Sequence, residues 1–167
     1  MKGLTAKGWR KVVMGDVVRE ETRRRGLAVD AGSTGAVMKD LRKQLGEAAV
    51  AKLCLKKVKE LGAERVVVDG IRSMAEVEEF KRDARVLLVA ILASPARRYS
   101  LLKGRGRSDD PASQDMFVSR DERELGVGIS RAIALADEVL SNEHNSPDEL
   151  SRRLNEVVDR WLASLEA

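Results

Sequence analysis

Asp69 and Arg72 stand at the end of a run of β-branched residues, where positions 65–72 read Arg-Val-Val-Val-Asp-Gly-Ile-Arg. Continuous apolar runs of this kind are typical of strands in parallel sheets that are covered on both faces. In such sheets ligands bind outside the carboxyl ends of the strands. The pattern therefore predicts that Asp69 and Arg72 face a ligand. The alternative is an ordinary strand end, at which Asp69 caps the next turn and Arg72 is solvated.

A second charged group follows the short apolar run at 12–14, where Gly15 and Asp16 precede Arg19. The planar guanidinium of Arg19 suits a phosphate group, to which it can donate two parallel hydrogen bonds. The N-terminus of the predicted helix adds backbone N–H donors for an anion. The alternative is a helix cap at Asp16 and a solvated arginine at position 19.

Two further arginines lie in a loop that contains glycine. Gly104 and Gly106 alternate with Arg105 and Arg107, and residues 108–111 read Ser-Asp-Asp-Pro. A flexible cationic loop of this kind can close over a bound anion and exclude water, as lids do in phosphoryl transfer. Alternatively, the loop is solvated and its two aspartates neutralise it.

Arg120 lies one helical turn before Glu124 in the helix that we predict after this loop. Both side chains can face the cleft that the other arginines would line. The same spacing also suits an intrahelical ion pair, which contributes only about 0.3–0.5 kcal/mol.

These four groups need a frame that brings them together. The sequence predicts strands at 12–14, 66–69 and 86–92 and an edge strand around 139–140, with helices between them. This alternation favours right-handed crossovers and a parallel sheet. We therefore expect an α/β fold with a three-layer parallel sheet that carries helices on both faces.

Several predicted helix starts carry a capping signal. They are Ser33 or Thr34, Ser73 with Glu76, Ser94 with Pro95, Pro111, and Ser146 with Pro147.

Composition narrows the possible classes of function. The 167 residues suit a single domain over 1–167, with a lid region at about 104–126. One cysteine, Cys54, excludes an intramolecular disulfide, and one histidine, His144, excludes a His/Cys metal cluster. We therefore expect a reducing cytoplasm. The longest apolar run, at 86–93, is too short to span a bilayer, so we expect no membrane partner.

The net charge of +4 suits an anionic small substrate as well as it suits nucleic acid. A basic RNA-binding module that uses Arg19 and residues 23–25 is therefore an alternative. Glu20 and Glu21 interrupt that basic patch, and only 3% of the residues are aromatic. Because single-stranded nucleic acid is usually bound by stacking on aromatic side chains, the composition disfavours this alternative.

The order of these features resembles the P-loop nucleotide kinases, the group that contains adenylate kinase and dephospho-CoA kinase. The resemblance is closest to an archaeal dephospho-CoA-kinase-like family. The segments that carry it are 12–20 (VVMGDVVRE), 66–73 (VVVDGIRS), 104–111 (GRGRSDDP), 120–128 (RDERELGVG) and 136–143 (ADEVLSNE). They follow one another in the right order over nearly the whole chain, which argues against chance agreement.

The resemblance implies ATP-dependent phosphoryl transfer to a nucleoside monophosphate or dephospho-CoA, with Mg²⁺ and ATP as cofactors. It also implies a helical lid insertion and a role for each matching residue. The acceptor nucleotide would contact Gly15, Asp16, Arg19, Gly70 and Arg72. The catalytic residues would be Asp69, Arg105 and Arg107 of the lid, and Arg120, and Asp69 would hold Mg²⁺ through water. The donor base would lie near Asn142.

One essential motif of those kinases is missing from this chain. They need an initial strand followed by G-x-x-x-x-G-K-S/T, whose backbone amides and lysine hold the donor phosphates. Residues 1–9 resemble the C-terminal part of the helix after that loop, so the central first strand would precede Met1. We expect either a fragment of a longer product or a degenerate relative whose sheet a partner completes. Little or no turnover is then expected, and a non-catalytic pseudo-kinase that binds nucleotide or a partner is the alternative function.

Overall fold

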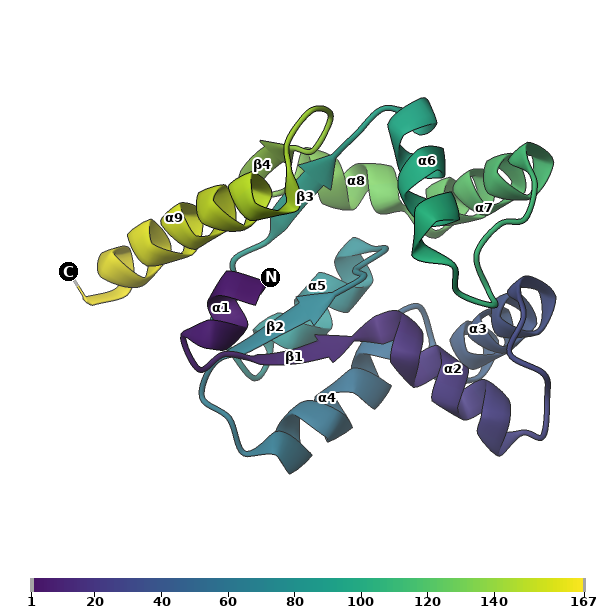
Figure 1. Ribbon diagram of the computed structural model, residues 1–167. Coiled ribbons are helices and arrows are strands. Elements are labelled where there is room, and N and C mark those ends of the chain that lie inside the picture. The colour runs from purple at the N-terminus through teal and green to yellow at the C-terminus, as the bar shows by residue number, and fades with distance from the viewer. Residues whose placement is uncertain (1, 167) are drawn as a thin grey trace.

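The computed structural model describes residues 2–166 (Figure 1). Helices and strands alternate along most of the chain, as the sequence predicts. In order they are α1 (Lys2–Ala6), β1 (Arg10–Val13), α2 (Met14–Arg24), α3 (Ala31–Leu45), α4 (Ala49–Leu61), β2 (Val66–Asp69), α5 (Met74–Lys81), β3 (Val89–Leu92), α6 (Pro95–Arg105), α7 (Gln114–Val127), α8 (Ile129–Ala134), β4 (Glu138–Ser141) and α9 (Pro147–Glu166).

The strands pair in parallel but form two small sheets. β1 pairs with β2, with Val13 opposite Asp69, and β3 pairs with β4, with Leu92 opposite Ser141. The prediction of an α/β fold with parallel strands is therefore confirmed, and the described strands form two separate sheets with no strand between β2 and β3. The parallel register places the residues that follow Val13 and Asp69 side by side at one edge.

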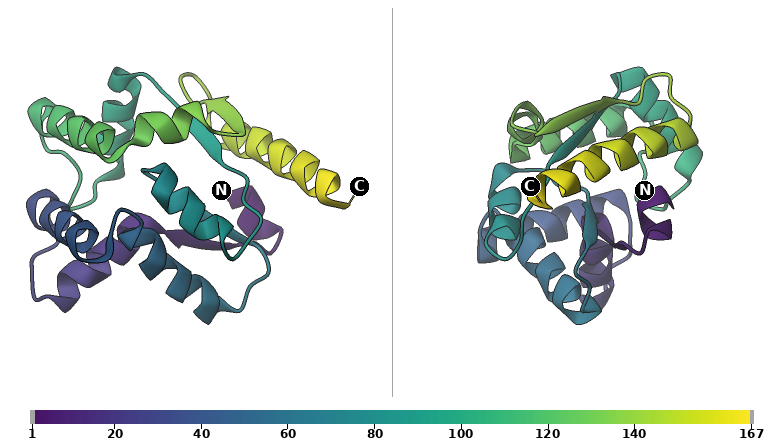
Figure 2. Two further views of the ribbon diagram at one scale, coloured as in Figure 1. Left: turned by 180° about the vertical axis from the view of Figure 1, so that it is seen from behind. Right: turned by 90° about the vertical axis from the view of Figure 1, so that its left-hand side faces the viewer.

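Helices cover both faces of the β1–β2 sheet. Val66 and Val68 point to the main core, which α2, α3 and α4 complete on one face. Val67, between them, points to a second cluster with Leu4 of α1 and Leu154 of α9. Figure 2 shows α1 lying against α9. Apolar residues can therefore run continuously along β2, because each face of the strand meets a helix layer.

Two strand boundaries differ from the prediction. The first strand spans Arg10–Val13 rather than 12–14, because Met14 already begins α2. The third spans Val89–Leu92 rather than 86–92. The backbone N–H of Leu88 donates to the carboxylate of Asp137 (2.7 Å), so a side chain takes up this donor before the ladder with β4 begins.

Two helix starts also differ from the prediction. Asp30, rather than Ser33 or Thr34, caps α3, and its carboxylate accepts the N–H of Ser33 at 2.7 Å. Ser113, rather than Pro111, caps α7. In both cases a short polar side chain just upstream reaches a free N–H of the first turn, which is the usual requirement of an N-cap.

The caps predicted at Ser73, Ser94 and Ser146 are confirmed, because each hydroxyl accepts a backbone N–H three residues later. The first of these caps matters for the site, since it fixes where the loop after β2 ends and α5 begins.

Residues 2–166 contain no ionised thiol, no metal-binding cluster and no membrane-spanning helix. Burial raises the pKa of the Cys54 thiol to about 12, so this cysteine stays protonated within the main core. No three His, Cys, Asp or Glu side chains in this part of the chain lie where they could hold a metal ion. Each of its helices is too short or too polar to cross a bilayer.

Acid is expected to destabilise the fold through Glu21 of α2. Hydrogen bonds from Arg24 and Arg25 lower the pKa of Glu21 from its ordinary value of 4.5 to about 2. Because the folded pKa is depressed, this stabilisation is present above about pH 4.5 and is lost as the pH falls towards 2. Urea unfolding across this range should show a smaller loss of unfolding free energy for Glu21→Gln than for the unchanged chain. Parallel pH profiles for the two proteins would contradict the assignment.

Candidate functional site

A cleft lies at the carboxyl ends of β1 and β2. Helices α2 and α3 form one wall, and the loop at 106–113 with α7 forms the other (Figure 1). Its volume is about 200 Å³. The structure brings most of the predicted site residues to it: Gly15, Arg19, Asp69, Gly70, Arg72, Arg105, Arg107 and Arg120 all line the cleft.

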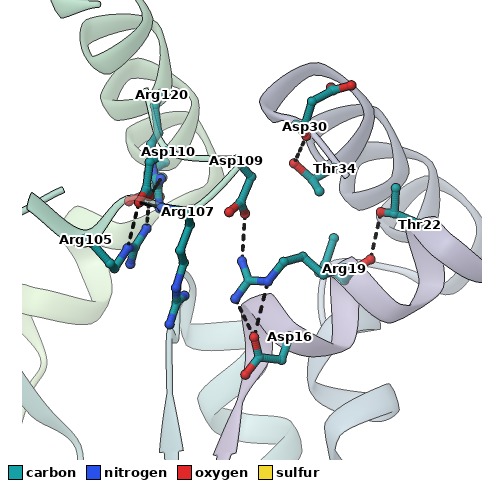
Figure 3. A network of polar contacts seen from close by, with 12 residues as sticks. Asp16, Arg19, Thr22, Asp30, Thr34, Arg105, Arg107, Asp109, Asp110 and Arg120 are labelled. Atoms are coloured by element: carbon teal, nitrogen blue, oxygen red, sulfur yellow. Dashed lines mark hydrogen bonds and ion pairs between the residues drawn. The ribbon is translucent and has the colours of Figure 1, made fainter. Parts of the chain in front are cut away.

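Arg19 links the two walls of the cleft. Only 12% of its side chain is exposed, and its Nη1 lies 2.7 Å from Oδ2 of Asp109 in the loop (Figure 3). Its Nη2 donates to Oδ1 of Asp16 at 2.5 Å. The carboxylate of Asp16 thus holds Arg19, and the residue at the N-cap of α2 is Val13. The alternative prediction, in which Asp16 caps the helix and Arg19 is solvated, is therefore wrong.

The loop is organised by Asp110, whose side chain is 6% exposed. It forms ion pairs with Arg105 and with Arg120, the latter at 3.9 Å, and it accepts the backbone N–H of Arg107 at 2.9 Å. Burial by itself would raise the pKa of Asp110, but the hydrogen bonds from Arg105 and from the N–H of Arg107 outweigh it and lower this pKa. The carboxylate therefore stays ionised and holds the loop together.

The prediction of two glycine hinges in this loop is only half right. Gly104 lies inside α6, which continues to Arg105, because nothing at this position forces the helix to end. Gly106 has φ +68° and ends that helix in a left-handed conformation, which suits glycine. The side chain of Arg107 then extends from the loop towards the strand ends, and among residues 2–166 it has no ion-pair partner (Figure 3). Within the described residues, Arg107 is therefore the loop arginine that no carboxylate pairs with, whereas Arg105 is held by Asp110.

Glu124 joins two of the predicted arginines. Its Oε1 lies 3.2 Å from Nε of Arg120 and also 3.2 Å from Nε of Arg72. The intrahelical pair that we considered as an alternative for Arg120 is thus formed. The same carboxylate also holds Arg72, which belongs to the loop after β2, so the pair is part of the cleft wall.

Asp69 ends β2 with its side chain 43% exposed. Its nearest ionic partner among the described residues is Lys11, whose Nζ lies 3.8 Å away. Ser73, and not Asp69, caps the next helix. The alternative role of Asp69 as a cap is therefore wrong, and its carboxylate stays accessible to a ligand in the cleft.

Asn142 lies apart from this cleft, on the loop after β4, where its backbone N–H donates to the carbonyl of Leu92 at 2.6 Å. Next to it, Glu143 accepts hydrogen bonds from both the N–H and the hydroxyl of Ser94. These bonds lower the pKa of Glu143. They tie the loop after β4 to the end of β3.

Three charged residues of the cleft were not predicted as site residues from the sequence. Arg42 of α3 and Glu76 of α5 form a buried ion pair at the cleft. Arg123 of α7 lies against Gly35 of α3 so closely that a Cβ at Gly35 would be 2.6 Å from its Nη1. Only Glu76 carried a signal, the capping-box spacing to Ser73, and that signal indicated a helix start rather than a site.

Fold and cleft together define an α/β protein with an arginine-rich site at the carboxyl ends of parallel strands. No protein-family model matches the chain. It is 45% identical to the UPF0200 protein MJ1399 of Methanocaldococcus jannaschii over 157 residues, which cover 93% of this chain and 79% of that protein. It is 42% identical to a UPF0200 protein of Thermococcus onnurineus over 168 residues, or 98% and 90% of the two chains. It is 38% identical to the UPF0200 protein PH1008 of Pyrococcus horikoshii over 173 residues, or 98% and 92%.

The chain therefore belongs to UPF0200, an archaeal protein family.

Proposed function

We propose that the cleft binds the phosphate of a small nucleotide, and that the fold is that of a P-loop nucleotide kinase. The parent activity would transfer the terminal phosphate of Mg-ATP to a nucleoside monophosphate or dephospho-CoA. The supporting observation is the convergence of Arg19, Arg72 and Arg120 on one cleft at the carboxyl ends of parallel strands. Arginines arranged in this way bind phosphate as forks and stabilise the charge of a transferred phosphoryl group.

The charges around the cleft support an anionic ligand. Seven arginines and four carboxylates line it, which leaves an excess of positive charge. Asp109 contacts the guanidinium of Arg19 and Glu124 that of Arg72, and both arginines line the cleft. A phosphate group offers the same oxygens with more charge, so it can exchange with these carboxylates.

The residues of this chain fit the acceptor better than the donor. The sequence contains no G-x-x-x-x-G-K-S/T segment. Asp69 is a single carboxylate with a lysine neighbour, and one carboxylate does not form a Mg²⁺ site without substrate phosphates. Mg²⁺ and ATP are therefore proposed for the parent activity alone, with Asp69 acting through water and Asn142 near the donor base. We expect little or no turnover from this chain.

The same observations favour a binding-only protein as the second candidate, because the acceptor arginines are present without a donor cradle. The RNA-binding alternative gains no such support. Arg24 and Arg25, two of its four proposed cations, both donate to Glu21. We propose that the protein is located in the reducing cytoplasm, since its single cysteine, Cys54, is buried and forms no disulfide.

A further strand, from an upstream segment or a partner, is proposed to join the two sheets. Among the strands that the structure describes, β2 and β3 each pair with one neighbour, yet Val67 and Val89 border the same apolar cluster. Ile91 and Leu92 of β3 remain 46% and 38% exposed. Unpaired strand edges of this kind are ready to accept another strand. An in-frame strand and phosphate-loop motif in the DNA upstream of Met1 would identify the upstream source.

Calorimetry with AMP, CMP, dephospho-CoA and ATP tests the proposed function. We expect at least one of the three acceptors to bind, and ATP to bind weakly or not at all, because only the acceptor arginines are in place. A coupled assay for phosphoryl transfer should stay at background. Measurable turnover that Asp69→Asn abolishes would contradict the expected inactivity. Absence of binding by all three acceptors would overturn the proposal, and tight, steeply salt-dependent RNA binding would revive the alternative.

A further inference from the structure

A buried ion pair lies at the base of the cleft. Nη2 of Arg42 in α3 donates to Oε1 of Glu76 in α5 at 2.8 Å, and the two side chains are 14% and 0% exposed. The Nε of Arg42 is buried without a hydrogen-bond partner within residues 2–166. A buried pair with an unmet donor adds little to stability compared with well-packed apolar side chains. Its presence beside a binding cleft therefore calls for a functional explanation.

Glu76 departs from the capping box that its spacing predicts. In that motif the glutamate reaches back to the backbone N–H of the N-cap residue, here Ser73. Instead, Oε2 of Glu76 accepts the backbone N–H of Arg72 at 2.7 Å, one residue further back. The carboxylate thus holds the main chain of the residue whose guanidinium lines the cleft.

The side chain of Arg72 is held separately from its backbone. Its Nη1 donates to the carbonyl of Ile71 at 3.1 Å, and its Nε faces Glu124 of α7 at 3.2 Å. With five N–H donors, the guanidinium keeps capacity for a phosphate. Glu76 therefore fixes the base of a side chain whose tip remains available to the ligand.

Arg42, the partner of Glu76, belongs to α3, in the cleft wall opposite the loop at 106–113 and α7. Arg42 lies two helical turns after Thr34 and Gly35 on α3, and all three residues line the same cleft. The chain of contacts from α3 through Arg42 and Glu76 to Arg72 is continuous. These contacts link the position of α3 to the arginine proposed to hold the acceptor phosphate.

We propose that Arg42 and Glu76 are positioning residues that set Arg72 for the acceptor phosphate and couple this grip to the wall formed by α3. This inference rests on the proposed function, since it assumes a phosphate ligand. Recognition of the rest of the acceptor at α3 would then tighten the hold of Arg72 on the phosphate. Neither Arg42 nor Glu76 needs to touch the ligand.

A double-mutant cycle on AMP affinity, measured by calorimetry, tests the coupling. Glu76→Gln keeps the shape of the side chain but loses the charge that pairs with Arg42, and we expect AMP to bind about tenfold more weakly. In an Arg72→Ala background the same change should alter affinity by less than about twofold. Glu138→Gln, which removes one charge of an exposed Arg–Glu pair, is the matched control and should leave affinity unchanged. Full affinity in Glu76→Gln, or an equal loss in both backgrounds, would overturn the inference.

A second variant gives a test that remains informative if Glu76→Gln misfolds or if the proposed function is wrong. Arg42→Met/Glu76→Leu replaces the pair by apolar side chains, and we expect it to fold but to bind AMP about tenfold more weakly. Hydrogen exchange of the Arg72 amide should speed up in it, while exchange in β2 at Val67 stays unchanged. If the unaltered chain binds no acceptor, the proposed function fails, but hydrogen exchange still tests whether the Arg42–Glu76 pair holds the backbone of Arg72. An unchanged exchange rate for the Arg72 amide would then overturn this positioning role.

Discussion

Replacing Arg19 with alanine is expected to weaken monophosphate binding by about 10- to 100-fold. A hydrogen bond to a charged group contributes about 1.5–3 kcal/mol, and each 1.4 kcal/mol corresponds to a tenfold change in affinity. Arg19 is the least exposed guanidinium paired across the cleft, with 12% of its side chain accessible. Calorimetric titration with AMP and with inorganic phosphate measures the effect.

Arg24 supplies the matched control for this prediction. It lies on the same helix, but its side chain is 75% exposed and its one partner within residues 2–166 is Glu21, so Arg24→Ala should leave the affinity unchanged. Equal losses in Arg19→Ala and Arg24→Ala would show that the overall charge, and not the cleft, attracts the ligand.

Asp109→Asn is the informative companion to Arg19→Ala. The carboxylate of Asp109 occupies Arg19 and leaves its own Oδ1 buried without a partner within residues 2–166. An incoming phosphate must displace this carboxylate, so neutralising Asp109 should strengthen binding, by several-fold. Weaker binding in Asp109→Asn would instead place Asp109 among the groups that support the ligand.

Removing Arg42 alone is expected to lower the free energy of unfolding by about 3–5 kcal/mol, the usual effect of leaving a buried charge without its partner. Arg42→Met leaves the fully buried carboxylate of Glu76 facing an apolar side chain. Since a domain of this size is stable by only about 5–15 kcal/mol, the loss would be evident in urea or thermal unfolding.

Two variants make this prediction specific. Arg160→Met removes an exposed Arg–Glu pair between α9 and β4 and should cost about 1 kcal/mol or less. Arg42→Met/Glu76→Leu should regain most of the stability lost by Arg42→Met, because it leaves no unpaired charge. A single variant as stable as the unaltered chain would mean that water reaches Glu76.

The site could be predicted in pieces but not as an assembly. Arg19, Arg72 and Arg120 were each recognisable from a local pattern, yet each also suited a plain helix surface or strand end. The alternatives separated only through contacts between distant segments. Arg19 meets Asp109 across 90 positions of the chain, and Arg42 meets Glu76 across 34. No local pattern encodes such pairs, so the buried partner Arg42 gave no signal.

The helices and strands that carry the site were likewise predictable only where a feature depends on neighbouring residues. The caps at Ser73, Ser94 and Ser146 could be predicted because a cap depends on a side chain and a backbone N–H only three residues apart. The start of β3 could not, since its ladder begins only after the carboxylate of Asp137 has taken the N–H of Leu88. Which strands pair depends on contacts between distant segments rather than on the strands themselves.

The sequence by itself determined the α/β class, the strand that ends at Asp69 and the set of arginines suited to phosphate, because these follow from residue type and local spacing. Only the tertiary structure decided that Asp69 faces a cleft instead of capping a helix, and that carboxylates of the loop and α7 hold Arg19 and Arg72. The parallel register of β1 and β2 is the physical reason, since it brings residues far apart in the chain to one edge.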